Sequence, residues 1–383
     1  MNYGFLISIA IIIIVTKILG DVTNKFNMTQ VVGALFAGII IGPACLGIIE
    51  EDVFTTEAAE IGVILLMFTA GLDTSIPQLK ANLKACFAIA FLGVLVPLAG
   101  GAAAYYLYFE AGSLSYIAIL KAIFVGVVLT ATSVSITVEA LREMGKLETK
   151  VGNAILGAAV IDDVLGIIVL TVVMSLKDES VSLVPVLLKI LIYAVVMAVV
   201  AFICFRFKGR IDRNVKKRRI TTFALAACFA ISYITEVKFG IADITGAYLL
   251  GLFLSGHEIK KEICRKIAPV SYLIFSPIFF ASVGLKVDVQ GITGDLVVFA
   301  IILLLVACIT KVIGCGLGAG ICGFDFKDSM RIGVGMVARG EVALIVAQKG
   351  YAAGLIAPAM FAPIVIMIIF TTVCTPMLLK KMM

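Results

Sequence analysis

Long apolar segments, separated by short polar loops, run through almost the whole chain. A helix that spans a membrane needs about 20 mainly apolar residues, and stretches of that length recur from one end of the sequence to the other. The pattern predicts an all-α polytopic membrane protein with about 13 transmembrane helices. The predicted spans lie near 3–20, 29–49, 55–72, 82–109, 115–141, 149–176, 181–205, 219–236, 240–256, 264–283, 294–318, 328–350 and 357–379.

The composition agrees with this class. Hydrophobic residues make up 62% of the 383 positions and charged residues 15%, and the mean hydropathy is +1.15. No soluble fold has enough interior for that share of apolar sequence, so soluble enzymes are excluded. The first segment lacks a basic leader and a small-residue cleavage site, so we expect a retained helix. The nine cysteines show no metal-binding or redox spacing, and we expect no cofactor.

Lys and Arg are distributed unevenly between the two faces of the predicted membrane domain. Most of the 31 basic residues lie in alternate loops and at the C-terminus, whereas the loops of the other face hold Lys121, Lys177, Lys238, Lys286 and Lys349. Cytoplasmic loops carry the excess of basic residues, so the N-terminus is predicted outside and the C-terminus in the cytoplasm. The net charge of +6 then belongs to cytoplasmic loops, and no nucleic-acid partner is implied.

Matching residues, mostly small ones, recur at a constant separation of 213 positions. The pairs are Gly33 and Gly246, Ala34 and Ala247, Gly38 and Gly251, Gly71 and Gly284, and Leu72 and Leu285. The separation equals seven predicted spans, an odd number, so the two copies must lie upside down relative to each other. Residues 1–176 and 218–383 are therefore predicted to be inverted-topology repeats, which are typical of secondary transporters with a site at the membrane midplane.

Two adjacent carboxyls, Asp162 and Asp163, lie near the middle of the predicted span 149–176. A charge at the centre of a bilayer costs at least about 2.5 kcal/mol, so the pair is expected to have a function. Neighbouring residues on a helix point about 100° apart. One carboxyl can therefore face a wet cavity while the other faces a neighbouring helix, which disfavours a shared-proton aspartyl dyad. The alternative is that the carboxyls are neutral and only form structural hydrogen bonds.

The carboxyl that faces a neighbouring helix needs a cation as its partner. Lys311, inside the predicted span 294–318, is the best candidate. We expect a buried salt bridge between Lys311 and one of the two carboxyls, because a buried charge left without its partner is strongly destabilising.

Two spans are predicted to be broken helices that cross at the midplane. One contains the polar run 130–135, with Thr130, Thr132 and Ser133, and the other contains Arg339 and Glu341 at the equivalent place in the second repeat. Unwound backbone at this depth is tolerated only beside protein or a water-filled cavity. The alternative for the polar run is an intact helix whose hydroxyls bond its own carbonyls. Arg339 and Glu341 either compensate the dipoles of the half-helices or contact the ion.

These motifs occur in a fixed order over nearly the whole chain. The run from Thr130 to Thr137 comes first, followed by Ile161-Asp162-Asp163, Lys311, and the segment from Arg339 to Leu344. This arrangement resembles the monovalent cation/proton antiporters, most closely the NapA-type electrogenic Na+/H+ antiporters. The resemblance implies a transporter rather than an enzyme. It also implies a homodimer in the cytoplasmic membrane that exchanges Na+, and Li+, for H+ by elevator-type alternating access.

The resemblance also implies a division into domains. A dimerisation domain would comprise residues 1–80 and 218–290, and a core transport domain would comprise residues 81–176 and 291–383. Residues 177–217 would form a linker helix and a basic cytoplasmic loop. The expected partners are monovalent cations, protons and membrane lipid.

The resemblance implies that Asp162 forms the salt bridge with Lys311 and that Asp163 carries the ion. The expected mechanism is then competition for the carboxyl of Asp163. Burial favours the neutral form of a carboxyl, so Asp163 can hold a proton or exchange it for Na+. Na+ is a hard cation that takes oxygen ligands. The carboxylate of Asp163 would supply them, with Asp162, Thr132 or Ser133 as further ligands.

Three other functions remain open at this stage. A K+/H+ antiporter or K+ efflux system could use the same fold, since the choice of ion rests on the resemblance alone. An intramembrane aspartyl protease would need Asp residues on two helices, whereas the other midplane candidates are Lys311, Arg339 and Glu341. A gated channel would differ from a transporter in its turnover.

Overall fold

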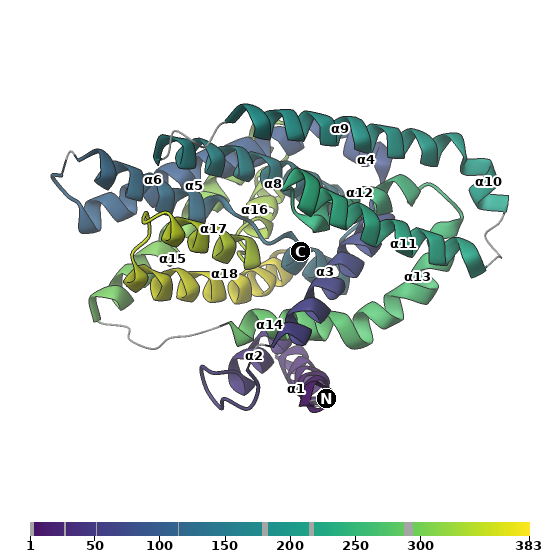
Figure 1. Cartoon of the computed structure of the whole chain (residues 1–383), viewed down its shortest axis with the longest axis horizontal. Helices are drawn as coiled ribbons and strands as arrows, with labels where there is room; N and C mark the ends of the chain where they lie inside the picture. Colours follow the sequence, from purple (N-terminus) through teal and green to yellow (C-terminus); the bar gives the residue numbers. More distant parts are fainter. Residues whose placement is uncertain are drawn as a thin grey trace.

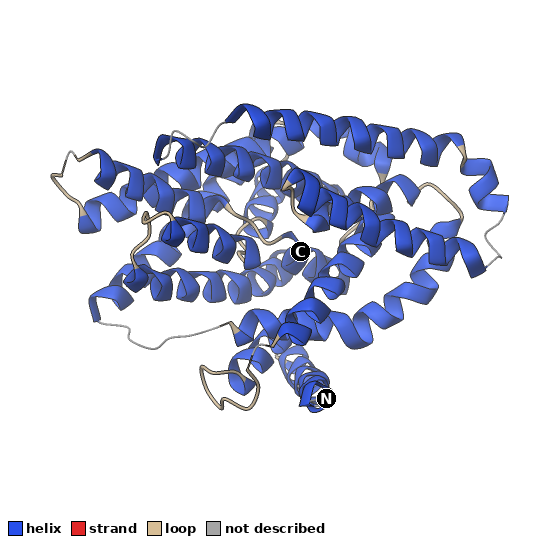
Figure 2. Cartoon of the chain, in the orientation of Figure 1, coloured by secondary structure: helices blue, strands red, loops and turns tan. Residues whose placement is uncertain are grey.

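The computed structural model describes residues 4–26, 28–50, 52–113, 115–177, 183–213, 218–286 and 294–383. Within these ranges every regular element is a helix (Figure 2). The predicted linker 177–217 is covered only in part, because residues 178–182 and 214–217 lie outside the described residues. The predicted domain boundary at residue 290 also lies outside them.

Ten described helical segments are long and apolar enough to cross a membrane. They are α1 (Gly4–Lys25), α3 (Val53–Asp73), α5 (Leu83–Phe109), α6 (Tyr116–Thr130) with α7 (Val134–Glu143), α8 (Lys150–Lys177), α9 (Leu183–Arg206), α11 (Arg218–Ile234) with η1 (Thr235–Phe239), α13 (Ile259–Val270) with η2 (Ser271–Phe275) and α14 (Ser276–Leu285), α15 (Gly294–Ile321), and η3 (Pro358–Met360) with α18 (Phe361–Met382).

The three remaining predicted spans are helical but short or interrupted. They are α2 (Gln30–Ile41), α12 (Asp243–Leu254), and the pair α16 (Phe326–Gly335) and α17 (Glu341–Ala352). A helix of 12 residues, such as α2, rises only about 18 Å, less than the roughly 30 Å of a bilayer core. The predicted extent 29–49 was too long, because α2 ends before Gly42 and Pro43, and proline disfavours helix in the residue before it. A total of thirteen crossings stays a prediction. Two further short helices are α4 (Ile76–Ala81) and α10 (Lys208–Arg213).

The helices pack in two groups (Figure 1). The first helix group consists of α1–α3 and α11–α14, in which α3 contacts α12 and α14 and α2 contacts α1 and α14. The second helix group consists of α5–α8 and α15–α18, in which α15 contacts α5, α16 and α18. Helix α9 contacts α8 of the second group and α12 of the first. Each group draws on both halves of the sequence.

Close backbone contacts within the first helix group use the glycines of the proposed repeat. A Cβ atom on Gly38 of α2 would lie 2.9 Å from Cα of Gly284 in α14. A Cβ atom on Gly251 of α12 would lie 3.1 Å from Cα of Gly71 in α3. Only glycine allows such an approach. Adding 213 to Gly38 gives Gly251, and subtracting 213 from Gly284 gives Gly71, so the repeat separation relates the two contacts as an internal two-fold axis would. The inverted repeat itself stays a prediction.

Helix α9 runs along one edge of the molecule (Figure 1). Most of its apolar side chains are exposed, among them Leu187, Leu191, Val195 and Phe202. An exposed apolar helix of this length is typical of a surface that contacts lipid. Helix α9, which makes up most of the described part of the predicted linker, therefore has the surface of a membrane helix.

Candidate functional site

Both predicted helix breaks are present. Helix α6 ends at Thr130 and α7 begins at Val134, while α16 ends at Gly335 and α17 begins at Glu341. The alternative of an intact helix through the polar run is therefore wrong. The unwound part is shorter than the run 130–135, because Thr130 is still helical and the helix resumes at Val134.

The two breaks contact each other directly. The Ser133 backbone N–H donates to the Ala338 carbonyl at 2.7 Å, and Thr137 Oγ1 donates to the Gly335 carbonyl at 2.7 Å. A Cβ atom on Gly340 would lie 2.7 Å from Ser133 Oγ, so glycine lets the second break approach the first. Each break thus satisfies part of the other's backbone, as unwound backbone at membrane depth requires.

Arg339 contacts the C-terminal end of one half-helix, and Glu341 lies at the N-terminal end of another. Arg339 is fully buried, and its Nη1 donates to the Ala131 carbonyl at 2.6 Å, directly beyond the C-terminal end of α6. Its own carbonyl accepts a hydrogen bond from Thr372 Oγ1 of α18. Glu341 is the first residue of α17. A cation at a helix C-terminus and an anion at an N-terminus both compensate the helix dipole, which favours this role over direct ion contact for Arg339.

Small residues bring α15 close to α5. A Cβ atom on Gly314 would lie 2.5 Å from the Leu92 carbonyl, and one on Gly318 would lie 2.6 Å from the Ala88 carbonyl. These contacts leave no room for a larger residue at either glycine. The close approach allows a side chain of α15 to reach the backbone of α5.

Lys311 is the side chain that uses this approach. Its Nζ donates to the Gly93 carbonyl of α5 at 2.9 Å and to the Thr130 carbonyl of α6 at 2.9 Å. It also lies 3.0 Å from Asp162 Oδ1, so the predicted salt bridge is present. The side chain of Lys311 is 0% exposed and that of Asp162 is 2% exposed. An ammonium has three N–H donors, and here each has an acceptor, which offsets the cost of burying the charge.

Asp163 points away from this ion pair. Its Oδ2 accepts a hydrogen bond from Thr245 Oγ1 of α12 at 3.3 Å. Asp163 is half-buried, whereas Asp162 is buried. Among the described residues no Lys or Arg forms an ion pair with Asp163. The two adjacent carboxyls thus diverge as the helix period predicts, one toward the second helix group and one toward the first.

A cavity of about 1130 Å³ lies between the two helix groups, at the end of the molecule where α3 begins. Its ionisable lining residues are almost all acidic: Asp52, Glu57, Glu60, Glu236, Asp243 and Glu341, with Lys286 as the exception. Ile244 also lines it and is followed directly by Thr245, the residue bonded to Asp163. An acidic cavity with low-dielectric walls raises the local concentration of cations, here close to the helix turn that contacts Asp163.

Two oxygen atoms near the breaks are buried without a hydrogen-bond partner in the described structure: Thr132 Oγ1 and Glu341 Oε2. Leaving a buried polar atom unpaired costs about 1–3 kcal/mol, so such atoms are candidates for binding a ligand. Ser133 Oγ lies 3.3 Å from Ser135 Oγ. No hydrogen bond among the described residues joins Thr132 to Asp163, so their joint action on one ion stays a prediction.

At the other end of α3 the helix groups are joined by polar contacts. Glu143 of α7 accepts hydrogen bonds from the backbone N–H groups of Gln30 and Val31, at 2.8 and 3.2 Å. These two N–H groups belong to the free N-terminus of α2, where a carboxylate also faces the positive end of the helix dipole. Lys380 of α18 donates to the Met28 carbonyl at 2.9 Å.

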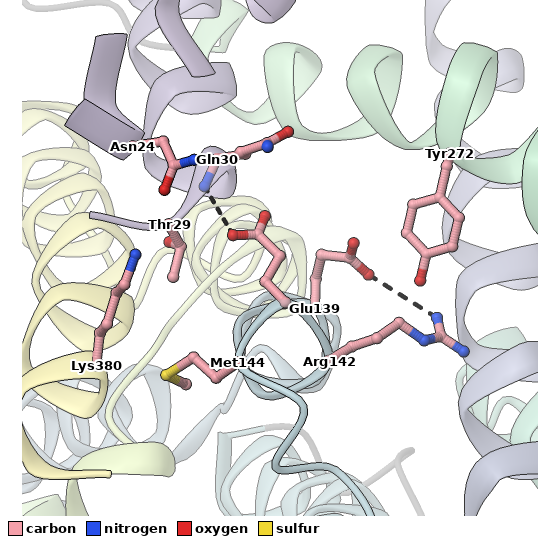
Figure 3. A pocket seen from close by; sticks show the side chains of 9 residues that line it. Asn24, Thr29, Gln30, Glu139, Arg142, Met144, Tyr272 and Lys380 are labelled. Atoms are coloured by element: carbon pink, nitrogen blue, oxygen red, sulfur yellow. Dashed lines mark hydrogen bonds and ion pairs between the residues drawn. The ribbon is translucent and has the colours of Figure 1, made fainter. Parts of the chain in front are cut away.

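Arg142 makes a further contact between the groups, beside a smaller cavity of about 580 Å³ (Figure 3). Its Nη2 donates to Asp73 Oδ2, at the C-terminal end of α3, at 2.9 Å. The same guanidinium lies 3.9 Å from Glu139 and 5.4 Å from the ring centre of Tyr272 (Figure 3). We refer to Asp73, Arg142, Glu143 and Lys380 as the polar gate.

Sequence reasoning missed Thr245 and the polar gate. Thr245 lies in the glycine-rich span 240–256, and the repeat separation pairs it with Val32, which has no hydroxyl. That mismatch was the one available signal. Glu143 and Arg142 are indistinguishable in sequence from ordinary charged residues at a helix end.

The sequence model of the protein family described as "Sodium/hydrogen exchanger, transmembrane" matches residues 7–383. The chain belongs to this family. The chain is accordingly a multi-pass membrane protein of the monovalent cation/proton antiporter superfamily, as the ordered motifs predicted.

Several relatives are similar over nearly their full length. The probable Na+/H+ antiporter GerT of Bacillus cereus is 44% identical over 98% of this chain and 99% of its own. The Na+/H+-K+ antiporter GerN of the same organism is 40% identical over 99% and 96%. The Na+/H+ antiporter of Enterococcus hirae is 34% identical over 97% and 96%. These relatives are named as antiporters, not as enzymes.

Among solved structures, the sodium proton antiporter MjNhaP1 of Methanocaldococcus jannaschii is similar in fold. One structure superposes with a TM-score of 0.76 at 16% identity and covers 100% of this chain and 96% of its own. The likeness confirms the all-helical membrane fold of the exchanger.

The buried ion pair generates a prediction on stability. Replacing Asp162 by Asn, or Lys311 by Met, leaves the other charge buried and unpaired, which costs about 3–5 kcal/mol. Replacing both together is expected to cost less than the sum of the two. Thermal unfolding of the four proteins in detergent measures this coupling.

The matched control is the pair Lys17 and Asp21, which is as short, at 2.9 Å, but 65% and 55% exposed. An exposed pair contributes about 0–1 kcal/mol, so the same cycle there should show almost no coupling. If the Asp162 and Lys311 effects simply add, the two charges do not depend on each other in the fold.

Proposed function

We propose that the protein exchanges Na+ for H+ across the cytoplasmic membrane, with Asp163 as the carboxyl that binds one or the other. The observation that carries the proposal is that the two adjacent acids make different contacts. Asp162 is held by Lys311, whereas Asp163 has a single hydroxyl partner and no paired cation among the described residues. The family and the names of the relatives support the choice of Na+ and H+.

The exchange follows from competition for Asp163. A carboxyl removed from water binds a proton more tightly than in water, and an ionised carboxylate there needs a cation beside it. A proton and a Na+ ion each neutralise it, and the two cannot occupy the same oxygen atoms. If the second helix group moves only when Asp163 is neutralised, by a proton or by Na+, the inward flow of one ion is coupled to the outward flow of the other.

We further propose that the exchange is electrogenic, with Lys311 as the second proton carrier. When Na+ binds beside Asp163, Asp162 can turn toward it and its bond to Lys311 weakens. A buried lysine without its counter-ion favours the uncharged amine and can release a proton. Two protons would then be exchanged for each Na+.

Alternating access is supported by the difference between the two ends of the molecule. At the end where α3 begins, the acidic cavity separates the helix groups. At the end where α3 finishes, the polar gate joins them. We assign the first group to the dimerisation domain of a homodimer and the second to a core that moves elevator-fashion. The distribution of Lys and Arg would place the open cavity outside and the gate, with the C-terminus, in the cytoplasm.

Exchange of K+ is the second candidate. It is favoured by one observation, the Na+/H+-K+ antiporter GerN, which is 40% identical to this chain over 99% of its length. Both functions use the same carboxyl, so they differ in the ion that the surrounding oxygen atoms accept.

The proposed function predicts that Asp163→Asn abolishes exchange, because an amide cannot cycle a proton. The wild-type protein in proteoliposomes should move protons, seen with a pH-sensitive dye, when Na+ or Li+ is added, and a response to K+ would show the second function. Asp163→Asn should reduce the signal to that of protein-free liposomes. The exposed substitution Asp21→Asn is the control. A wild-type rate in Asp163→Asn would remove Asp163 from the ion-carrying role.

Weakening the polar gate should shift the protein away from the state in which the acidic cavity is open and the gate is closed. Glu143→Ala removes the carboxylate that bonds the first N–H groups of α2, a contact of the kind worth about 0.5–2 kcal/mol. Hydrogen exchange should therefore rise about tenfold at residues 28–34 while it falls at residues 52–57 and 341–345, which border the opposite cavity.

Glu262→Ala is the matched control, because Glu262 pairs with Arg265 and Lys266 of its own helix. It should change neither region. If Glu143→Ala raises exchange at α2 alone and leaves the acidic cavity unchanged, the contact is local and does not control access.

A further inference from the structure

Thr245 is the one described side chain that forms a hydrogen bond to Asp163, and it belongs to the opposite helix group. Asp163 lies on α8 of the second group, and Thr245 lies in the first turn of α12 of the first group. The bond of 3.3 Å therefore crosses the boundary between the two groups at the proposed ion-carrying carboxyl.

The hydroxyl of Thr245 is used differently from those of most buried threonines in the long helices, although Thr372 of α18 also bonds outside its own helix. Thr69 and Thr235, for example, donate to carbonyls of their own helical segments, those of Leu66 and Ile231. Such a bond satisfies the hydroxyl locally and leaves it with no outside role. Thr245 is only 2% exposed, yet its hydroxyl donates to a side chain of another helix.

The position of Thr245 is fixed by the packing of α12. A Cβ atom on Gly251 would lie 3.1 Å from Cα of Gly71, so α12 and α3 touch through their backbones. Tyr248 of α12 also donates to Thr74 Oγ1 at 3.3 Å. The hydroxyl is therefore held by the first group and does not follow α8 if the second group moves.

The chemistry of a hydroxyl suits both occupants of Asp163. It donates to the ionised carboxylate, and its oxygen has two lone pairs that can face a cation or a protonated carboxyl. Hard cations take oxygen ligands, so the hydroxyl can join the carboxylate around Na+ without a change in the position of α12. Valine has nearly the same shape but offers neither function.

We propose that Thr245 positions Asp163 for cation capture in the state with the acidic cavity open, and contributes its hydroxyl oxygen to the bound Na+. This inference rests on the proposed function and assigns a specificity-determining residue to it. The contact is made while Thr245 and Asp163 are opposed and is lost when the second helix group carries Asp163 away. Thr245 therefore acts on the binding of the ion and not on its translocation.

The test compares Thr245→Val, Thr245→Ser and wild type in proteoliposomes over a series of Na+ concentrations applied from the side of the acidic cavity. Thr245→Val should raise the half-saturating Na+ concentration about fivefold to tenfold, the effect of losing one hydrogen bond or ligand, with the maximal rate within about twofold of wild type. Thr245→Ser keeps the hydroxyl and should restore the wild-type value. Thr69→Val is the control for removing a buried hydroxyl that does not contact Asp163.

Each outcome decides the question. An unchanged half-saturating concentration in Thr245→Val overturns the proposal, as does equal damage in Thr245→Ser, which would point to shape rather than the hydroxyl. A loss of maximal rate alone also overturns it. If the valine variant does not elute like wild type in size-exclusion chromatography, Thr245→Ala, which removes the same hydroxyl, takes the place of Thr245→Val in the comparison. A wild-type protein that does not respond to Na+ would instead overturn the proposed function itself.

Discussion

Lys311 places an ammonium group where α5, α6, α8 and α15 meet, and the arrangement of the site depends on how that charge is satisfied. The group is completely buried and bonds the carbonyls of Gly93 and Thr130 and the carboxylate of Asp162. An unpaired charge at this depth would be too costly to keep, so all three acceptors must be in place at once. Thr130 ends α6, so the ammonium also faces the negative end of a half-helix.

This constraint fixes the geometry around Asp163. Because Asp162 is committed to Lys311, the helix period turns Asp163 by about 100° away from the ion pair and toward the other helix group. There it meets Thr245, near a cavity lined by acids. The structure thus combines a buried, fully bonded ion pair with a neighbouring carboxyl that is bonded only by one hydroxyl. Such a carboxyl can change its occupant at a small structural cost.

The sequence predicted the parts of this site that carry strong local signals. Charges inside apolar spans stand out, so Asp162, Asp163, Lys311 and the two helix breaks could be found, and the helix period predicted that the acids diverge. The length of α2 was overestimated, because hydropathy continues past the point where Gly42 and Pro43 end the helix. Thr245 and the polar gate could not be predicted, since a threonine in a membrane helix usually bonds its own backbone and a charge at a helix end usually faces water. Their roles depend on which helices pack together.

In the proposed mechanism, the pair of Asp162 and Lys311 responds to the ion at Asp163 by moving a second proton. The most direct test is the transport current on a solid-supported membrane, recorded together with dye-detected proton flux, for wild type and Lys311→Gln. Wild type should carry net charge. Lys311→Gln, which cannot release the second proton, should still exchange Na+ for H+ but carry less charge for each proton moved. A mutant that carries undiminished charge per proton, or a wild type that exchanges without any current, would contradict this mechanism and leave Lys311 as a structural counter-ion.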